Sequence, residues 1–516
     1  MMKKALYSVF ILLIIAKSAI AQDLSTKLAE IDAYAEKVRK DWNVPGLAIS
    51  IVKDGKIIFA KGYGVREIGK AEKVDENTLF AVASNSKAFT TAALAILIDE
   101  GKINGWDDKV TNYLPEFQLY DAYVTREMTI RDLVCHRSGL DTFSGDLLWY
   151  ETTYTPDDIL RRVRYLKPVS SFRSRYGYQN LMFIAAGRIV EKVSGKSWGE
   201  FIRERILQPL GMNRTTTTVR DLKDNYAIPH NESGGKGLRP LPLGNIDNAI
   251  GAAGLNSSAA EMAKWLLLQL NHGKYEDKQI FSEKRAAEMW SSCVIVNPNP
   301  MPSKNSPNQF VTTYGLGWFI GDYRGRKLIY HSGGLDGMIS QSAIMPSENL
   351  GVVILTNSES SAALALRNKV LDIFTGTEEN RDWSTEYLKI AAERKAKQQE
   401  IYKKAETHRA INTKPSLALS EYQGIYSSQM YGDVQITLEN GKLVMKFVPA
   451  PNFVADLEHW HYDTFSIKWR DTVNYNFPRG WITFVLNRDG KPDEIKIDQP
   501  NDDFWFYELE LKRKVR

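Results

Sequence analysis

Cysteine is almost absent from this chain, and histidine is scarce. With only Cys135 and Cys293 among 516 residues, a disulfide framework of the kind that holds small secreted domains together is excluded, although a single bridge between the two is left open. The seven histidines show none of the spacings typical of zinc sites. We therefore expect neither a metal nor another cofactor.

An excess of basic charge is also missing. The formal net charge is +5, and three lysines lie within the first 21 residues, so the rest of the chain carries about +2. No basic stripe is interleaved with aromatic residues, although such a stripe is the usual mark of a nucleic-acid-binding surface. Nucleic acid is therefore not expected as a partner.

Long apolar runs are confined to the N-terminus. Two lysines precede an apolar run at residues 5–16, and Ala19-Ile20-Ala21 supplies the small-x-small pattern that signal peptidase cleaves. The run is short for a membrane span, although an uncleaved anchor is the alternative, and no cysteine follows it to carry a lipid. We expect residues 1–21 to be a signal peptide of a bacterial protein that is periplasmic or secreted, with no stable membrane insertion after cleavage.

The remaining length exceeds one ordinary core and predicts at least two domains. A helical pattern at residues 24–42 is followed by two alternating segments around Asp54-Gly55, a dipeptide typical of a tight hairpin turn. Helical patterns then run from 84 to about 270, and strand patterns return after residue 326. Strands at both ends predict an α+β domain over residues 22–378, in which helices flank one antiparallel sheet.

The last quarter of the chain has a different composition. Residues 379–414 are rich in Lys, Glu, Gln and Ala, which predicts a solvated helix that links two domains. From 415 to 516 about eight short strands follow, with Asn440-Gly441 at one turn, and they predict a small barrel or sandwich. We expect its aromatic residues to form the core, among them Trp460, Trp469, Trp481, Phe504 and Trp505, and the alternative that the domain borders a substrate cleft and restricts substrate size is left open.

The spacing Ser-x-x-Lys, which can place a serine nucleophile beside its base, occurs three times. Residues 50–53 lie in a predicted strand, where side chains three apart point to opposite faces. Residues 233–236 lie in a glycine-rich stretch where nothing fixes their geometry. Only Ser84 and Lys87 open a predicted helix, where residues three apart share one face.

The start of a helix suits nucleophilic chemistry. Backbone N–H groups there can hold an oxyanion, and the positive end of the dipole together with burial lowers the pKa of a lysine. A neutral Lys87 amine can then accept the hydroxyl proton of Ser84 and activate it as a nucleophile. In the alternative interpretation, Ser84 is a helix N-cap and Lys87 is a solvated residue of the first turn.

A second candidate nucleophile is Ser197, within a Gly-x-Ser-x-Gly sequence at residues 195–199. The nucleophile elbow of this sequence follows a strand, whereas residues 180–194 have helical periodicity. We therefore interpret Gly195 as a helix end, and Ser197 with Glu200 as the capping box of the next helix.

Three elements in a fixed order make the chain similar to the penicillin-recognising serine hydrolases, which include class C β-lactamases, D-Ala-D-Ala peptidases, D-aminopeptidases and esterases. They are Ser84-Asn85-Ser86-Lys87, Tyr178-Gln179-Asn180 and His331-Ser332-Gly333, where many relatives have Lys-Thr-Gly. The resemblance covers roughly residues 42–357 and implies the β-lactamase/transpeptidase-like fold. The C-terminal strands resemble the lipocalin-like domain appended to some members.

The resemblance implies a role for each matched residue. Ser84 is the nucleophile, Lys87 is its base, and Tyr178 beside a cationic lysine approaches the phenolate form and carries protons to the leaving group. A core position for Tyr178 is the alternative. The N–H groups of Ser84 and Gly334 form the oxyanion hole. The residues expected to bind the substrate are Asn180, His331, Ser332 and Gly333.

His331 is the main departure from the family's pattern. A lysine there provides positive charge for the substrate carboxylate in most β-lactamases, and a histidine provides it only weakly at neutral pH. This disfavours a β-lactamase but not a peptidase, since some D-Ala-D-Ala peptidases and D-aminopeptidases of the family have His-x-Gly. A histidine that only holds the strand edge is the alternative, and His136 is interpreted as structural.

The sequence thus predicts an exported serine hydrolase that forms an acyl-enzyme with a small substrate. The expected substrates are short peptides, including cell-wall-derived peptides with D-residues, or small esters. The alternatives are a penicillin-binding-like sensor or scaffold without catalysis, and a true β-lactamase. The sequence indicates no oligomeric state.

Overall fold

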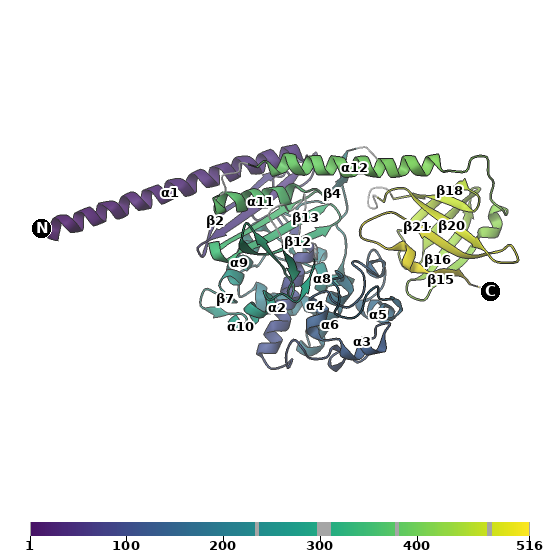
Figure 1. Cartoon of the computed structure of the whole chain (residues 1–516), viewed down its shortest axis with the longest axis horizontal. Helices are drawn as coiled ribbons and strands as arrows, with labels where there is room; N and C mark the ends of the chain where they lie inside the picture. The colour runs from purple at the N-terminus through teal and green to yellow at the C-terminus, as the bar shows by residue number, and fades with distance from the viewer. Residues whose placement is uncertain (1, 233–236, 297–310, 377–380, 472–476, 515–516) are drawn as a thin grey trace.

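The fold is known from a computed structural model that describes residues 2–232, 237–296, 311–376, 381–471 and 477–514, with the backbone alone from 2 to 21. An α+β domain and a closed β-barrel are joined by a long helix (Figure 1). This confirms the expected fold class. The domain boundary expected at residue 378 and the Ser-x-x-Lys copy at 233–236 lie outside the described residues.

One antiparallel sheet of eight strands organises the α+β domain, in the order β2-β1-β14-β13-β12-β11-β10-β9. Leu47 of β1 pairs with Thr356 of β14, so strands from both ends of the domain meet in one sheet, as the sequence predicts. The strands are β1 (Gly46–Lys53), β2 (Lys56–Gly64), β9 (Val294–Ile295), β10 (Thr312–Tyr314), β11 (Phe319–Tyr323), β12 (Arg326–Leu335), β13 (Met338–Met345) and β14 (Leu350–Thr356).

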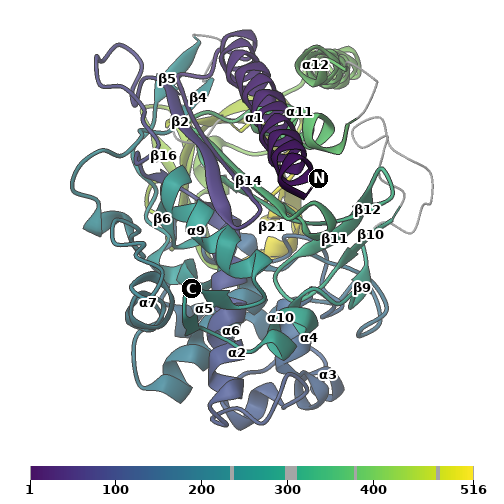
Figure 2. The same cartoon turned by 90° about the vertical axis from the view of Figure 1, so that its left-hand side faces the viewer.

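Helices cover both faces of this sheet (Figure 2). On β1, Leu47, Ile49 and Ile51 pack in one apolar cluster with α1 (Met2–Asp41) and α11 (Ala362–Thr375). The alternate residues Ala48 and Val52 pack in the cluster on the other face, because successive side chains of a strand point to opposite faces. That second cluster includes α2 (Ser86–Asp99), α6 (Asn180–Ser194), α8 (Ile250–Ala253) and α9 (Ala259–Leu270).

Shorter elements complete the α+β domain. Asp54 and Gly55, at the turn between β1 and β2, both have positive φ, 50° and 76°, as the predicted primed turn requires. The remaining helices are α3 (Ala122–Glu127), α4 (Ile130–Val134), α5 (Pro156–Arg162), α7 (Trp198–Ile202) and α10 (Glu283–Met289). The two-stranded pairs are β3 (Phe80–Ala81) with β6 (Asn256–Ser257), β4 (His230–Glu232) with β5 (Leu238–Pro240), and β7 (Lys274–Tyr275) with β8 (Lys278–Gln279).

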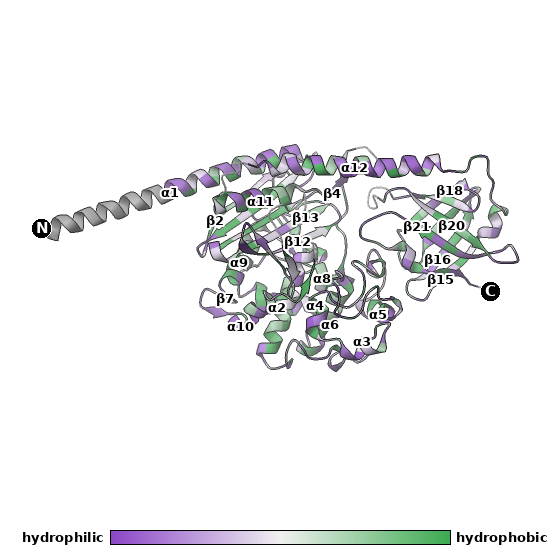
Figure 3. Ribbon diagram, viewed as in Figure 1, coloured by the Kyte–Doolittle hydropathy of each residue, from purple (hydrophilic) through white to green (hydrophobic). Residues whose placement is uncertain are grey.

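The connecting helix α12 (Trp383–Thr407) begins beside the end of α1 (Figures 1 and 2). The Tyr34 hydroxyl donates a hydrogen bond to Asp382 at 3.0 Å, and the Ser384 hydroxyl donates to Asp41 at 2.7 Å. The rest of α12 is mostly hydrophilic, as a solvated linker should be (Figure 3). In the part of the chain that the structure describes, no helix has both the length and the apolar character to cross a membrane.

The C-terminal domain is a closed antiparallel barrel of eight strands. Its predicted turn at Asn440-Gly441 has φ of 50° and 77°, and Trp469 is buried in its core. The strands are β15 (Gly424–Ser428), β16 (Gly432–Glu439), β17 (Lys442–Phe447), β18 (Val454–His461), β19 (Thr464–Trp469), β20 (Gly480–Leu486), β21 (Pro492–Asp498) and β22 (Leu511–Arg513).

The barrel docks on loops of the α+β domain. The Trp505 indole N–H donates to the Thr142 carbonyl at 2.6 Å, and the Tyr154 hydroxyl donates to the Tyr431 carbonyl at 2.5 Å. Phe504 stacks on Tyr150 at this interface. Phe504 and Trp505 therefore face the neighbouring domain, whereas the sequence analysis expected them in the barrel core. An aromatic side chain can pack in a barrel core or in a domain interface, so composition does not distinguish these two locations.

Candidate active site

Ser84 lies in a single helical turn, Ala83–Asn85, that leads directly into α2. Ala83 has a φ of 46°, a left-handed conformation that costs a residue with a Cβ about 1 kcal/mol or more. Ser84 is partly exposed and lines a cavity, whereas Lys87, in the first turn of α2, is completely buried. The strained turn thus presents the serine hydroxyl to the cavity and directs the lysine inward.

The Lys87 amine contacts three oxygens. Its Nζ lies 3.0 Å from Ser84 Oγ, 2.7 Å from Asn180 Oδ1 and 3.1 Å from the Ala252 carbonyl. Neither the amide oxygen nor the carbonyl can donate, so in the neutral amine both N–H groups point to them. The nitrogen lone pair is then directed at the Ser84 hydroxyl, which is the geometry a base needs to remove its proton.

Burial sets the charge of Lys87. Desolvation lowers the pKa of its amine to about 7, although the charge of Asp146 raises it in part. A large fraction of the amine is therefore neutral at neutral pH. A solvated first-turn lysine, the alternative left open by the sequence, does not describe this residue.

Tyr178 lies on the other side of the lysine. Its ring centroid is 4.8 Å from Lys87 Nζ. Burial raises the pKa of the phenol well above its usual value, and the nearby Ser84 hydroxyl offsets this only in part. The phenolate suggested by the sequence is thus disfavoured, because the desolvation of Tyr178 outweighs its neighbours, and the group is suited to donate a proton.

Asn180 links the lysine to a buried acid that the sequence analysis missed. Asn180 is the first residue of α6, and its Nδ2 donates to Asp146 Oδ2 at 2.6 Å while its Oδ1 accepts from Lys87. Asp146 is 2% exposed, and burial raises the pKa of its carboxyl to about 8. It begins a short 3-10 turn, Asp146–Leu148, whose sequence has no periodicity, so no signal in the sequence separated it from a surface aspartate.

His331 is buried on β12 and carries no charge. Burial and the nearby Lys87 lower its pKa to about 3. Its Nδ1–H donates to the Ser332 carbonyl at 2.6 Å, so Nε2 accepts from the Tyr314 hydroxyl at 2.9 Å. A neutral imidazole with both nitrogens bonded offers no cation to a substrate carboxylate.

His136 contacts the segment Tyr178-Gln179. Its Nδ1 accepts a hydrogen bond from the Gln179 backbone N–H at 3.0 Å, and its ring packs on Tyr178 with centroids 4.2 Å apart. Burial keeps the pKa of His136 well below its usual value. The residue is structural, as expected, although it holds Tyr178 and Gln179 as well as its own turn.

The end of β12 forms the remaining wall of the site. β12 pairs with β11 only as far as Tyr330, so the edge from His331 to Leu335 extends past its neighbour on that side among the described residues. An extended substrate can add to such an edge. Ser332 and Gly334 line the cavity on this edge.

Gly333, predicted to bind the substrate, does not line the cavity. It is buried against the turn of the nucleophile, where a Cβ would lie 2.2 Å from the Val82 carbonyl oxygen and 3.0 Å from the Ser84 nitrogen. Glycine is therefore required here so that β12 can approach Ser84 closely.

The cavity has a volume of about 750 Å³ and is bordered by both domains. The α+β domain supplies Ser84, Tyr178, Asn180 and His331, with the aromatic side chains of Phe143, Trp149, Tyr150, Tyr176 and Phe319. The barrel supplies Asp502, Asp503 and Phe504, and α12 supplies Arg394. The sequence left open that the barrel borders the cleft, but no pattern in it identified these barrel and linker residues.

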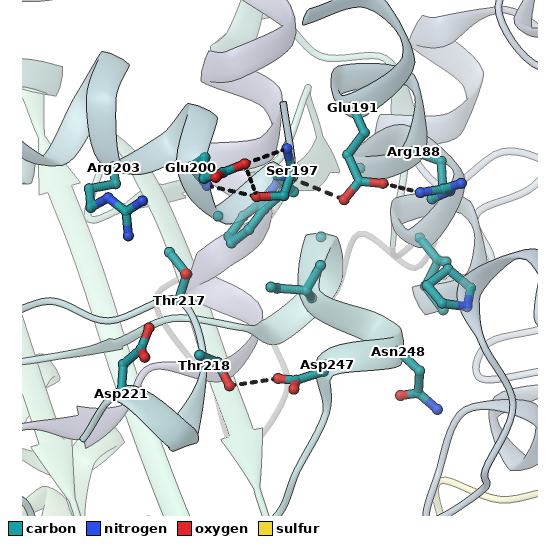
Figure 4. A pocket seen from close by; sticks show the side chains of 17 residues that line it. Arg188, Glu191, Ser197, Glu200, Arg203, Thr217, Thr218, Asp221, Asp247 and Asn248 are labelled. Atoms are coloured by element: carbon teal, nitrogen blue, oxygen red, sulfur yellow. Dashed lines mark hydrogen bonds and ion pairs between the residues drawn. The ribbon is translucent and has the colours of Figure 1, made fainter. Parts of the chain in front are cut away.

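Ser197 lies at a separate pocket of about 460 Å³ and has a capping role (Figure 4). Its hydroxyl donates to Glu200 Oε2 at 2.7 Å, and the Glu200 N–H donates back to Ser197 Oγ at 3.3 Å. Gly195, with a φ of 71°, ends α6 before it. The capping-box interpretation is confirmed, and the nucleophile elbow is excluded.

Other candidate groups have structural roles. Ser50 is buried in β1 while Lys53 bonds to Asp54 and Glu348 at the strand end, so this copy of Ser-x-x-Lys brings no pair together. Cys135 and Cys293 are both free thiols. Within the described ranges, no three His, Cys, Asp or Glu side chains are grouped to hold a metal ion.

Two family models match the chain. The model described as Beta-lactamase matches residues 31–375, and the model described as Domain of unknown function (DUF3471) matches residues 408–513. The first model thus contains every residue of the candidate site in the α+β domain, and the second contains most of the barrel.

Individual proteins are similar over most of their length. The chain is 30% identical over 439 residues to the unguisins hydrolase ungD′ of Aspergillus campestris, which covers 78% of this chain and 77% of that protein. An octameric penicillin-binding protein homologue from Pyrococcus abyssi is 22% identical, with a TM-score of 0.61 and coverage of 92% and 98%. A D-stereospecific amidohydrolase from Streptomyces sp. is 22% identical, with a TM-score of 0.54 and coverage of 67% and 99%.

Proposed function

The chain belongs to the Beta-lactamase family and is a serine hydrolase, and from this premise we propose that it cleaves amide or ester bonds of short peptides through an acyl-enzyme on Ser84. The observation that carries the proposal is the contact of the buried Lys87 amine with Ser84 Oγ at 3.0 Å. Because the pKa of Lys87 is lowered to about 7, the amine can act as a base at neutral pH.

In the acylation step, the Ser84 hydroxyl proton passes to Lys87 Nζ while Oγ bonds to the substrate carbonyl carbon. In this proposal the N–H groups of Ser84 and Gly334 receive the negative charge of the carbonyl oxygen. The bond to the leaving amine or alcohol then breaks, and the leaving group takes a proton from Tyr178, which Lys87 replaces. Water attacks the ester in the second half, with the same groups acting in reverse, and releases the acid and Ser84.

Peptides are favoured by the shape of the cavity. Its volume of about 750 Å³ lies within the range of pockets that hold drug-sized ligands, so a few residues fill it. The free edge of β12 suits an extended backbone. The similarity to a D-stereospecific amidohydrolase supports, but only through the fold, a D-residue next to the cleaved bond.

Two rivals are weakened by particular contacts. A sensor without catalysis has no need for a buried lysine whose lone pair is directed at a serine hydroxyl. A true β-lactamase needs a cation for the substrate carboxylate, and His331 is neutral and bonded through both nitrogens.

A fluorescent phosphonate probe tests the enzyme directly. We expect it to label the wild-type protein, with the adduct mapped to Ser84 by peptide mass analysis, and we expect Ser84→Ala to abolish labelling while Ser197→Ala leaves it intact. A folded wild-type protein that no such probe labels would contradict the proposal. A panel of matched L- and D-alanyl peptides, p-nitrophenyl esters and a chromogenic cephalosporin then identifies the substrate class, with the cephalosporin expected to be the poorest.

Export is a further part of the proposal, supported by the charged start, short apolar run and Ala19-Ile20-Ala21 sequence. The N-terminus of the protein recovered from a bacterial periplasm or culture medium is expected to be Gln22. Recovery of the protein only from the cytoplasm, with its N-terminal segment intact, would contradict export.

A further inference from the structure

The loop that carries Asp146 lies between the catalytic residues and the barrel. On one side, the Phe143 N–H donates to the Tyr178 carbonyl at 2.8 Å, and the Tyr178 N–H donates to Thr142 Oγ1 at 3.1 Å. On the other side, the barrel's Trp505 donates to the Thr142 carbonyl. A displacement of this loop therefore changes its contacts both with Tyr178 and with the barrel.

Glu508 of the barrel holds the turn immediately before Asp146. The Ser144 hydroxyl and the Gly145 N–H donate to its two carboxylate oxygens, at 2.6 Å and 2.8 Å. Ser144 is 1% exposed, so water does not compete at its end of these bonds. Two bonds to a single carboxylate fix position and orientation better than one.

Asp146 then determines how the Asn180 amide is turned. Asp146 Oδ2 accepts a hydrogen bond from the Asn180 NH₂ group, 2.6 Å away, which holds that group on the Asp146 side. The Asn180 oxygen is thereby directed to Lys87. If the amide were reversed, its NH₂ group would face the lysine and compete with Ser84 for the lone pair of the neutral amine.

We propose that the C-terminal barrel is part of the catalytic machinery, in which Glu508 and Asp146 are positioning residues that act in series on Asn180 and, through it, on Lys87. The proposal rests on the proposed function of Ser84 and Lys87. It gives a role to a domain whose family description assigns none.

The charges around the pair define a second readout. Asp146 faces Trp149, Asn180, Lys87 and, from the barrel, Asp503. Lys87 faces Ser84, Asn180, Tyr178, His136 and His331 as well as Asp146. Asp146 and Lys87 influence each other's pKa, so the titration of Lys87 depends on Asp146. Substitution of Asp146 therefore moves the acid limb of the pH profile of labelling.

The first experiment compares Glu508→Gln with Glu510→Gln in the full-length protein. The glutamine NH₂ group at 508 cannot accept from both Ser144 and Gly145, and we expect labelling of Ser84 by the phosphonate probe to slow about 10-fold to 100-fold. Glu510 is a matched control, because it crosses the same interface only through an exposed ion pair with Lys167, so Glu510→Gln should label at the wild-type rate.

The second experiment compares Asp146→Asn with Asp141→Asn, an exposed residue of the same loop. Asp146→Asn should slow labelling by a similar factor and shift the acid limb, whereas Asp141→Asn should do neither. Thermal unfolding of each variant identifies those that fold, and Asp146→Asn decides the question if Glu508→Gln does not fold.

The outcomes separate this proposal from the proposed function. An unlabelled wild-type protein contradicts the function of Ser84 itself. A labelled wild type with equally fast labelling of folded Glu508→Gln and Asp146→Asn overturns the positioning role. Slow labelling of Asp146→Asn with an unmoved acid limb overturns the link to Lys87, because a merely structural loss does not alter the titration of the base.

Discussion

Phe504 of the barrel stacks on Tyr150 of the α+β domain, with ring centroids 4.2 Å apart and planes inclined by 28°. Both residues line the cavity that contains Ser84. The two domains therefore line one cavity, and we expect the barrel to limit how far a substrate can extend beyond the serine.

Substitution of Phe504 tests that limit. Phe504→Ala removes the stacked ring and lengthens the cavity, so we expect the ratio of kcat/KM for longer over shorter peptides to rise about 10-fold. Tyr507→Ala, an exposed aromatic of the same segment, should leave the ratio at its wild-type value. An unchanged ratio in folded Phe504→Ala would show that the barrel does not restrict substrate length.

Removal of the base has a large expected effect. Lys87→Ala should lower turnover by a factor on the order of 100 to 10,000, as loss of a general base usually does. Lys196→Ala, which removes an exposed lysine at Ser197, is the matched control and should retain wild-type turnover. Near-normal turnover of Lys87→Ala would remove the lysine from its assigned role.

The pH dependence follows from the same residue. The base must be neutral, and burial lowers its pKa to about 7, so kcat/KM should rise as the pH increases through about 7 and level off above it. Below that value Lys87 is an ammonium ion that cannot accept the Ser84 proton. An acid limb of kcat/KM near pH 10, where a solvated lysine titrates, would contradict the assigned protonation state of Lys87.

Gly333 and Gly334 provide a matched pair for the packing of β12. A Cβ at Gly333 would lie 2.2 Å from a backbone oxygen, whereas a Cβ at Gly334 meets only Ile339 at 3.5 Å. Gly333→Ala should therefore lower the free energy of unfolding by about 1–3 kcal/mol, as overpacking does, and Gly334→Ala by less. Urea denaturation measures both. Equal free energies of unfolding for the two variants would mean that β12 is not closely packed on the turn that contains Ser84.

Several features of the fold follow from local patterns. The turn at Asp54-Gly55 and the choice of Ser84 with Lys87 were predictable, because each depends on residues at most three positions apart in the sequence. The pairing of β1 with β14 was predictable only as a general arrangement, from strand patterns at both ends of the domain.

The parts of the site that could not be predicted depend on burial and on distant contacts. Nothing in the sequence distinguishes Asp146 from an exposed aspartate. Only the fold shows that it is buried beside Asn180. The protonated state of Tyr178 results from desolvation, which no local pattern indicates. Phe504 belongs to a β-rich segment full of aromatic side chains, and only the docked domains show that it faces the cavity.

The pairing of Leu47 with Thr356 also determines when, during synthesis of the chain, this part of the sheet can form. A nascent chain presents β1 long before its partner β14 has been synthesised, and the barrel that holds the Asp146 loop follows later still. The nucleophile is thus among the first parts of the site to be made, while the residues that complete its surroundings are among the last. Hydrolytic activity therefore begins only when almost the whole polypeptide is available to fold.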